Sequence, residues 1–444
     1  MRIKKEVRKI VASVLAFLMV VSLIPVNSLM TKANAASKTT FEGGKTVEDG
    51  TWKGWTWNVF GSSTDVTKAF ATDTGNGGVT LEVTGDKGKI NGSASDQGLN
   101  TFLYELDKSY DFTITAQAKV DTLAANAQAA FGLTIRDNVG AHGNTAKLTA
   151  DKNNFAFVGG YGNQAASGHG NAGYKTTALA HTRLGESPEV GGTYDLAIQK
   201  VGDSVKLYFN GEVAAECSAD DLITDNAMYV GLFAARNAKV TFNNVKLAYT
   251  QDSSSVKVTT NVTAPKKTTY CAGNTYEDVD LTGFKATVSV DGKEREITAS
   301  DCVVDMSNDP FAEVTDAGKL NLLYLGQTIE VPITVIKEVV SDMYIEYMPV
   351  KTDYMVTDTA LDFTGLVGKV VYNSGRTFDL KTLIDSNDTN TKVSDVDFTT
   401  AGNKEVTVSH TYGDVTKEVV IPISVSDATV KNITITSPNT TRFY

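Results

Sequence analysis

The chain has 444 residues, a formal net charge of −11 and only 8 Pro beside 37 Gly. An acidic balance of this size argues against nucleic acid and anionic membrane surfaces as partners. Long Ala-, Leu-, Glu- and Lys-rich stretches are missing while Thr and Val are abundant, so the composition favours strands over helices. About 400 residues would remain after removal of a leader, enough for two to four domains.

The first 35 residues have the pattern of a secretory signal peptide. A basic segment, Arg2 to Lys9, precedes an apolar run from Ile10 to Val26, and Ala33-Asn34-Ala35 supplies small residues for cleavage. A membrane anchor is the alternative, but the run is short for a span and is interrupted by Pro25. We therefore expect residues 1–35 to be removed, and the rest to be extracellular with no membrane span.

Residues 37–250 read as short strands separated by turns. Apolar and polar residues alternate at 79–83, 112–116, 194–199, 229–233 and 240–247, and Asn210-Gly211 marks a tight hairpin between two apolar segments. This succession predicts an antiparallel two-sheet sandwich.

Three segments of this region resemble a known family. They are Asp96–Tyr104, Phe131–Asp137, and Tyr229–Arg236 together with Val240–Leu247. They resemble the lectin-like sandwich, of the concanavalin and laminin-G type, at the front of large secreted bacterial pectin-degrading proteins. The resemblance implies an accessory domain that binds plant cell-wall polysaccharide, with the chemistry done by a pectate lyase or pectinesterase module elsewhere.

The three tryptophans, Trp52, Trp55 and Trp57, are the first candidates for sugar contact. Sugar rings stack on exposed aromatic faces. The alternative is that Trp55 and Trp57, two apart on one strand, share a face and anchor the core, which leaves Trp52 as the exposed member.

A glycine-rich segment, Val158 to Gly173, holds two further candidates, Tyr161 and His169. We interpret the segment as a long loop, which either is mobile or lines a ligand site. Arg136 follows a buried strand, and Asp137 comes next in the sequence. Two roles are therefore open for Arg136: it forms a structural ion pair, or it clamps a bound sugar.

The second half of the chain is a tandem repeat. Pro265, Tyr270 and Asp280-Leu-Thr-Gly283 return as Pro349, Tyr354 and Asp362-Phe-Thr-Gly365, and a third copy begins near Ile435. Both copies resemble bacterial Ig-like modules, which implies small β-sandwiches used for spacing. The expected divisions are residues 254–337, 338–427 and a truncated unit at 428–444, joined flexibly near 251–256 and more stiffly near 337–343.

The repeats offer few groups for chemistry. Asp280 and Asp362 sit in turn motifs and are interpreted as architectural, with calcium binding as the alternative. No other cofactor is indicated. Cys271 and Cys302 lie in one repeat unit, and a disulfide between them is allowed in an oxidising compartment but is not required.

The sequence lacks the motifs of common hydrolases. The nearest approach to a Glu-x-Asp-x-Glu strand is Glu105-Leu-Asp107, and residue 109 is Ser. We predict an all-β, non-catalytic carbohydrate-binding and spacing region of a polysaccharide-processing protein. A cell-surface stalk built from the same modules is the first alternative, and a hydrolase or lyase of another kind in the lectin-like domain is the second.

Overall fold

The computed structural model describes residues 38–90, 97–125, 128–148, 153–163, 166–174, 180–183, 188–428 and 434. The predicted signal peptide and the predicted third repeat lie outside these residues, apart from 428 and 434. The chain divides into two compact units. One unit comprises residues up to Thr260 with Thr287–Asp305 and Leu323–Ile329, and the other comprises Asn261–Ala286, Met306–Leu322 and the residues from Glu330 onward.

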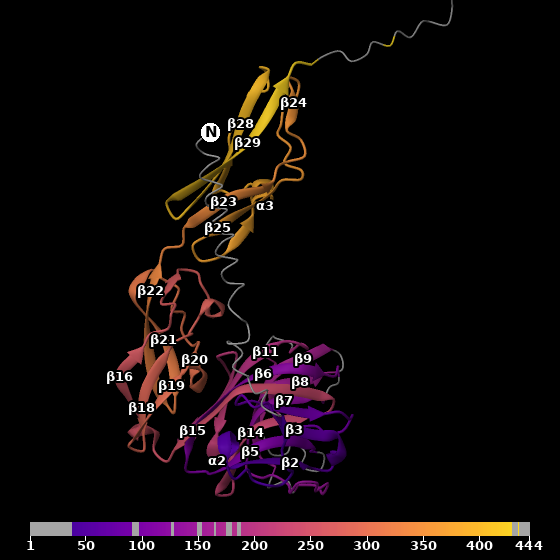
Figure 1. Cartoon of the computed structure of the whole chain (residues 1–444), viewed down its shortest axis with the longest axis vertical. Helices are drawn as coiled ribbons and strands as arrows, with labels where there is room; N and C mark the ends of the chain where they lie inside the picture. Colours follow the sequence, from indigo (N-terminus) through magenta and orange to yellow (C-terminus); the bar gives the residue numbers. More distant parts are fainter. Residues whose placement is uncertain are drawn as a thin grey trace, which may run out of the picture. The chain divides into compact units, whose positions relative to one another are not determined.

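Residues 39–250 form a sandwich of two antiparallel sheets, drawn in indigo to magenta in Figure 1. The eight-stranded sheet has the order β1-β3-β4-β15-β6-β11-β12-β13. Its strands are β1 (Thr39–Thr40), β3 (Ala69–Asp73), β4 (Val79–Val83), β15 (Ala238–Thr250), β6 (Asp111–Leu123), β11 (Thr193–Val201), β12 (Ser204–Phe209) and β13 (Glu212–Ser218). The predicted turn at Asn210-Gly211 is confirmed, because both residues adopt positive φ between β12 and β13.

The seven-stranded sheet has the order β10-β9-β8-β7-β14-β5-β2. Its strands are β10 (Ala180–Arg183), β9 (Ala166–Tyr174), β8 (Phe155–Asn163), β7 (Ala130–Arg136), β14 (Ala227–Ala235), β5 (Leu99–Asp107) and β2 (Trp55–Phe60). Short helices η2 (Gly50–Trp52), η3 (Val66–Lys68) and α2 (Ala219–Leu222) accompany the sheets. The predicted strands at 79–83, 112–116, 194–199, 229–233 and 240–247 are all present.

The core of the sandwich follows from strand alternation. In β4, Val79, Leu81 and Val83 are buried and the residues between them are partly exposed. The buried members join Phe102, Leu232 and their neighbours in one apolar cluster between the sheets. Burial of this surface is the main stabilising contribution to such a fold.

The first repeat also has two sheets, with orders β16-β18-β19 and β17-β22-β21-β20. Its elements are η6 (Ser253–Ser255), β16 (Lys257–Thr263), β17 (Thr269–Cys271), η7 (Tyr276–Asp278), β18 (Lys285–Val290), β19 (Lys293–Thr298), η8 (Ala299–Asp301), β20 (Val303–Asp305), β21 (Thr315–Tyr324) and β22 (Gln327–Ile336).

The second repeat has the same plan, with orders β23-β25-β26 and β24-β29-β28-β27. Its elements are β23 (Val340–Tyr347), β24 (Asp353–Met355), β25 (Val367–Tyr372), β26 (Thr377–Asp379), α3 (Leu380–Asp385), β27 (Thr391–Val393), β28 (Gly402–Tyr412) and β29 (Val415–Ser426). In both repeats the first short strand of the four-stranded sheet runs parallel to the last strand, β17 to β22 and β24 to β29.

The repeated motif folds in the same way in both copies. The Tyr354 hydroxyl accepts a hydrogen bond from the backbone N–H of Asp362 (2.9 Å), and the Asp362 carboxylate accepts one from the N–H of Thr364 (2.8 Å). Lys351 lies over the Tyr354 ring, 4.5 Å from its centroid. The first repeat has the same three contacts, made by Tyr270, Asp280, Thr282 and Lys267. The turn motif is therefore architectural, as the sequence predicts.

The segment that leads into the first repeat is held by hydrogen bonds. Thr250, which is fully buried, donates from Oγ1 to Asp291 Oδ1 (2.7 Å), and the Gln327 amide donates to the carbonyl of Ser253 (2.9 Å). Val256 is buried as well. These contacts argue against the flexible joint expected from Ser253-Ser254-Ser255.

The segment that leads into the second repeat is held by the corresponding turn. Asn373, in the turn between β25 and β26, accepts from the N–H of Val339 (2.9 Å) and donates to the carbonyl of Lys337 (3.1 Å). The buried Glu338 carboxylate accepts from Arg376 Nε (2.8 Å), and this hydrogen bond raises the pKa of Arg376. The turns at Asp291 and Asn373 thus hold the incoming chain in both repeats.

Candidate functional site

The three tryptophans lie in the core of the first sandwich. Trp52, Trp55 and Trp57 are 4%, 5% and 8% exposed. The short helix η2 folds Trp52 back so that its ring meets Trp55 edge-on at 5.7 Å, and Trp55 stacks on Phe102 at 5.2 Å. The expectation that Trp52 or Trp55 meets a sugar is wrong, because neither ring has a free face. The alternative, core anchoring, describes all three.

Trp57 takes part in a buried polar contact between the two sheets. Its Nε1–H donates to Asn100 Oδ1 (2.7 Å), and the Asn100 amide donates to the carbonyls of Phe70 (2.8 Å) and Glu82 (3.1 Å). Asn100 is 1% exposed. A buried side chain with all of its polar groups satisfied fixes the register of the strands it joins.

Arg136, at the end of β7, is fully buried. Its guanidinium lies over the rings of Phe155 (4.9 Å) and Phe60 (5.6 Å), and Nη2 donates to Asn153 Oδ1 (3.1 Å). Burial lowers the pKa of Arg136 to about 10. A sugar clamp is therefore wrong for this residue, because no ligand has access to it.

The neighbouring Asp137 does not form the direct ion pair that the sequence suggested. Its carboxylate accepts hydrogen bonds from the backbone and side chain of Asn154 (3.0 and 2.8 Å) and from Thr224 (3.2 Å). Burial raises the pKa of Asp137. Arg136 and Asp137 are structural groups that bind separate partners, and Nη1 of Arg136 is buried without one.

The glycine-rich segment is a hairpin, not a loop. Strands β8 and β9 pair along it, and Tyr161 lies opposite His169 in the register. Glycines are required where strands approach closely: a Cβ on Gly159 would lie 2.1 Å from the carbonyl oxygen of Phe131, and one on Gly160 would lie 2.2 Å from the Phe131 ring. The two predicted ligand residues therefore occupy adjacent strands, β8 and β9.

Tyr161 lies at the margin of a second apolar cluster, on the outer face of the seven-stranded sheet. Phe155, Phe157 and Phe233 form the centre of this cluster and are completely buried. Tyr161 contacts Phe157 (6.2 Å between ring centroids) and remains partly exposed, and burial raises its pKa. The centre of this face is therefore closed to a ligand, whereas Tyr161 at its margin is partly exposed.

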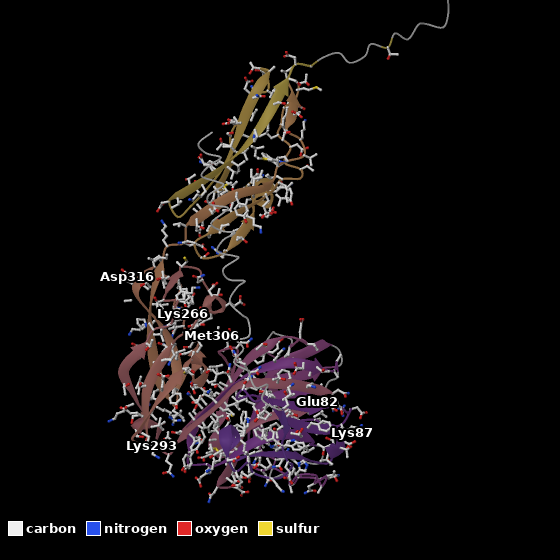
Figure 2. The ribbon with its side chains drawn as sticks, in the orientation of Figure 1. Glu82, Lys87, Lys266, Lys293, Met306 and Asp316 are labelled. Atoms are coloured by element: carbon white, nitrogen blue, oxygen red, sulfur yellow. The ribbon has the colours of Figure 1, made fainter. Side chains whose placement is uncertain are left out.

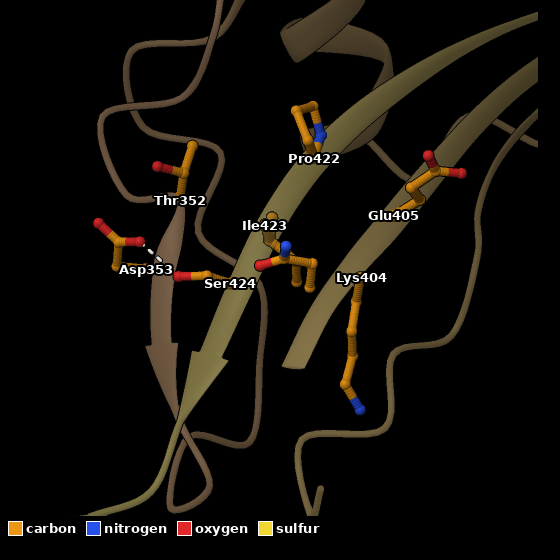
Figure 3. Close-up of a pocket in the computed structure, with 8 residues that line it drawn as sticks. Thr352, Asp353, Lys404, Glu405, Pro422, Ile423 and Ser424 are labelled. Carbon is orange, nitrogen blue, oxygen red and sulfur yellow. Dashed lines mark hydrogen bonds between the residues drawn. The ribbon is translucent and has the colours of Figure 1, made fainter. Parts of the chain in front are cut away.

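An open hollow of about 680 Å³ lies on the second repeat (Figure 3). Thr352, Asp353, Lys404, Glu405, Pro422 and Ser424 are among its lining residues, and Asp353 accepts a hydrogen bond from Ser424 (2.5 Å). Lys404 pairs with Asp397. No aromatic side chain lines this hollow, so it lacks the stacking surface that sugars favour.

All three cysteines are free thiols, so the disulfide considered for Cys271 and Cys302 is not formed. Burial raises the pKa of both thiols, which makes them unreactive. Among the described residues no group of three or more His, Cys, Asp or Glu side chains could hold a metal ion. In the same residues no helix is long and apolar enough to cross a membrane.

Sequence reasoning missed one exposed aromatic residue of the first sandwich. Phe70, on β3, is 40% exposed and pairs across the strands with Glu82. The alternation Ala69-Phe70-Ala71-Thr72 places Phe70 opposite to two core alanines, so the signal was present once β3 was recognised as a strand.

The comparisons with known proteins bear on this fold. The chain is 29% identical over 327 residues to Pectate lyase L from Thermoclostridium stercorarium, which is 72% of this chain and 24% of that protein. Its sequence is similar to part of a pectate lyase. The chain spans about a quarter of that relative's length, and no family model matches it.

Solved structures similar to this chain include lectin II from Ulex europaeus and a carbohydrate-binding module from Bacillus subtilis. The lectin is 12% identical and covers 48% of this chain and 97% of its own, with a TM-score of 0.30. The module is 15% identical and covers 47% and 98%, with a TM-score of 0.24.

Proposed function

We propose that this chain is a carbohydrate-binding and spacing region of an extracellular protein that processes polysaccharide. The observation that carries the proposal is the similarity to Pectate lyase L along most of this chain but over only a quarter of that protein. In this proposal residues 37–250 bind glycan, with pectin of the plant cell wall as the expected substrate. Residues 254–427 are two Ig-like spacers, and 428–444 begin a further one.

The proposal assigns no catalytic step to these residues. The sequence carries no carboxylate triad on a strand, and Arg136 and Asp137 are buried, each beside structural partners of its own. Tyr161 and His169 remain the proposed ligand contacts of the original set, since the two positions pair in the register of β8 and β9 and Tyr161 is partly exposed.

Two measurements test the proposal on the purified chain. Affinity electrophoresis in gels that contain polygalacturonate or a neutral galactan should show retarded migration in at least one glycan. An absorbance assay for unsaturated uronide should show no product. Steady product release that survives repurification would contradict the non-catalytic assignment. Unretarded migration in every glycan would contradict carbohydrate binding, and only the spacing role would then remain.

A surface stalk is the second candidate, and a specific observation favours it. Both repeats hold the chain that enters them, through Asp291 in the first and Asn373 in the second. Modules that hold their own linkers suit a spacer whether or not the first sandwich binds sugar.

A further inference from the structure

The outer face of the eight-stranded sheet carries a row of threonines that runs across the strands. The register joins Thr40 to Thr72, Thr72 to Thr80, Thr80 to Thr241, Thr241 to Lys119 and Lys119 to Thr193. Each of these six residues is exposed or partly exposed, whereas their strand neighbours Ala71, Leu81 and Val240 are core residues. At the ordinary spacing of neighbouring strands the row is about 24 Å long.

The hydroxyls in this row have a fixed direction. Thr241 Oγ1 donates its single proton to Asp121 Oδ2 (2.6 Å), so in the 3.0 Å contact between the Thr80 and Thr241 hydroxyls Thr80 is the donor. Thr80 Oγ1 therefore keeps both of its lone pairs and can act as an acceptor. A sugar hydroxyl is the kind of donor that fits such an acceptor.

A second row lies beside the first on the same face. Phe70 pairs with Glu82, and Glu82 pairs with Lys239, whose Nζ lies 3.0 Å from the carboxylate. Figure 2 labels Glu82 on the first sandwich. Phe70 is the one aromatic residue among the exposed large apolar side chains described in residues 38–250. Phe70 supplies a ring for stacking beside the carboxylate of Glu82 and the ammonium group of Lys239.

The other half of this face already binds a neighbouring segment of the chain through threonines. Thr115 Oγ1 donates to the carbonyl of Ser300 (2.6 Å), Thr113 Oγ1 accepts from the N–H of Leu325 (3.1 Å), and Tyr208 packs on Val303. All of these residues belong to one compact unit. The threonine row continues this interface onto the uncovered part of the sheet.

We infer that the threonine row, together with Phe70, Glu82 and Lys239, binds an extended polysaccharide chain that lies across the strands. This rests on the proposed function and locates it on a face that the sequence did not indicate. The strand spacing is close to the length of one pyranose residue along an extended glycan, so successive strands meet successive sugars. One sugar ring stacks on Phe70, and the threonine hydroxyls exchange hydrogen bonds with sugar hydroxyls.

The test uses the full chain and compares three variants with the unmodified protein. Phe70→Ala removes the stacking ring, and the double variant Thr72→Val with Thr80→Val removes hydroxyls at nearly constant volume. Val213→Ala is the matched control, because Val213 is 50% exposed on β13, at the opposite edge of the same sheet. Circular dichroism should be the same for all four proteins.

Binding is measured by affinity electrophoresis in polygalacturonate and in neutral galactan, which separates recognition of carboxylates from recognition of hydroxyls. We expect Phe70→Ala to weaken binding about fivefold, the scale of an aromatic contact. The double threonine variant should weaken it about fivefold as well, the scale of one net hydrogen bond, and Val213→Ala should change nothing. A fourth variant, Tyr161→Ala, tests the contact proposed on the other sheet. Unchanged binding in both variants of the threonine row, with loss of binding in Tyr161→Ala, would overturn the inference and leave the proposed function intact. Absence of binding by the unmodified chain would overturn both.

Discussion

Asn100 shows how one buried polar residue joins the two sheets of the first sandwich. It lies on β5 and reaches the backbone of β3 and β4 while it accepts the indole proton of Trp57. Removal of such a partner leaves a buried donor unsatisfied, which costs more free energy than the hydrogen bond itself contributes. The position therefore tolerates neither an apolar residue nor a smaller one.

We predict that Asn100→Leu lowers the free energy of unfolding of the first sandwich by about 3 kcal/mol, since it strands the Trp57 N–H in the core. The three tryptophans all lie in this sandwich. Their fluorescence during urea unfolding thus reports on it alone. Asn76→Ala, at an exposed position, is the control and should leave the midpoint unchanged. Equal midpoints for the two variants would refute the bridging role.

At the scale of the element, the repeated turn is stabilised by its aspartate. The pKa of Asp280 and of Asp362 is lowered, first by the side-chain hydrogen bond from the following threonine and then by the backbone one. A carboxyl whose pKa is lower in the folded state stabilises the fold above its ordinary pKa. That contribution is lost as the pH falls through the lowered value.

The expected consequence is a pH-dependent difference between the native chain and Asp362→Asn, which keeps an acceptor oxygen but does not titrate. The native chain should be the more stable above pH 3.8, and the difference should shrink as the pH falls below it. Hydrogen exchange of peptides that cover β24 and β25 measures this locally. A difference that is constant down to pH 2 would rule out the carboxylate as its source.

The tyrosine of the motif makes a separate contribution. Tyr354→Phe removes the hydroxyl that accepts from the N–H of Asp362, and we expect a loss of about 1 kcal/mol, the net worth of one hydrogen bond. Faster exchange should appear at Asp362 in that variant. Tyr347→Phe, at a 69% exposed position on β23, should leave that exchange unchanged.

At the scale of the whole molecule, the sequence predicted the positions of strands along the chain well and the burial of single side chains less well. The alternation in 79–83 and the Asn210-Gly211 turn are local signals, and both are confirmed. The burial of Trp52 depends on Phe102, which is distant in the sequence. The glycines at 159 and 160 read as a loop because their requirement arises from the partner strand at Phe131. Patterns of one strand carry no information about such contacts.

The joint before the first repeat is also held by contacts between residues that are distant in the sequence. These contacts give a further prediction. Because Thr250, Ser253 and Val256 are buried, residues 251–256 should resist limited proteolysis until the first compact unit unfolds. Thr250→Val with Gln327→Ala removes two of the hydrogen bonds that hold the segment and should expose it to cleavage. Early cleavage in this segment of the unmodified chain, detected by mass spectrometry, would instead support a flexible joint.

In each repeat the first strand of the four-stranded sheet runs parallel to the last strand of the repeat, and this pairing has a mechanical consequence. In β24 and β29, Asp353, Tyr354 and Met355 lie beside Ser424, Val425 and Ser426 and run in the same direction. Tension that reaches β24 from its N-terminal end and β29 from its C-terminal end pulls these strands past each other, so the hydrogen bonds between them are loaded in shear and must break together. An antiparallel hairpin pulled from its open end loses its bonds one at a time. Repeats built in this way would resist extension under load, which suits the spacing role proposed for them.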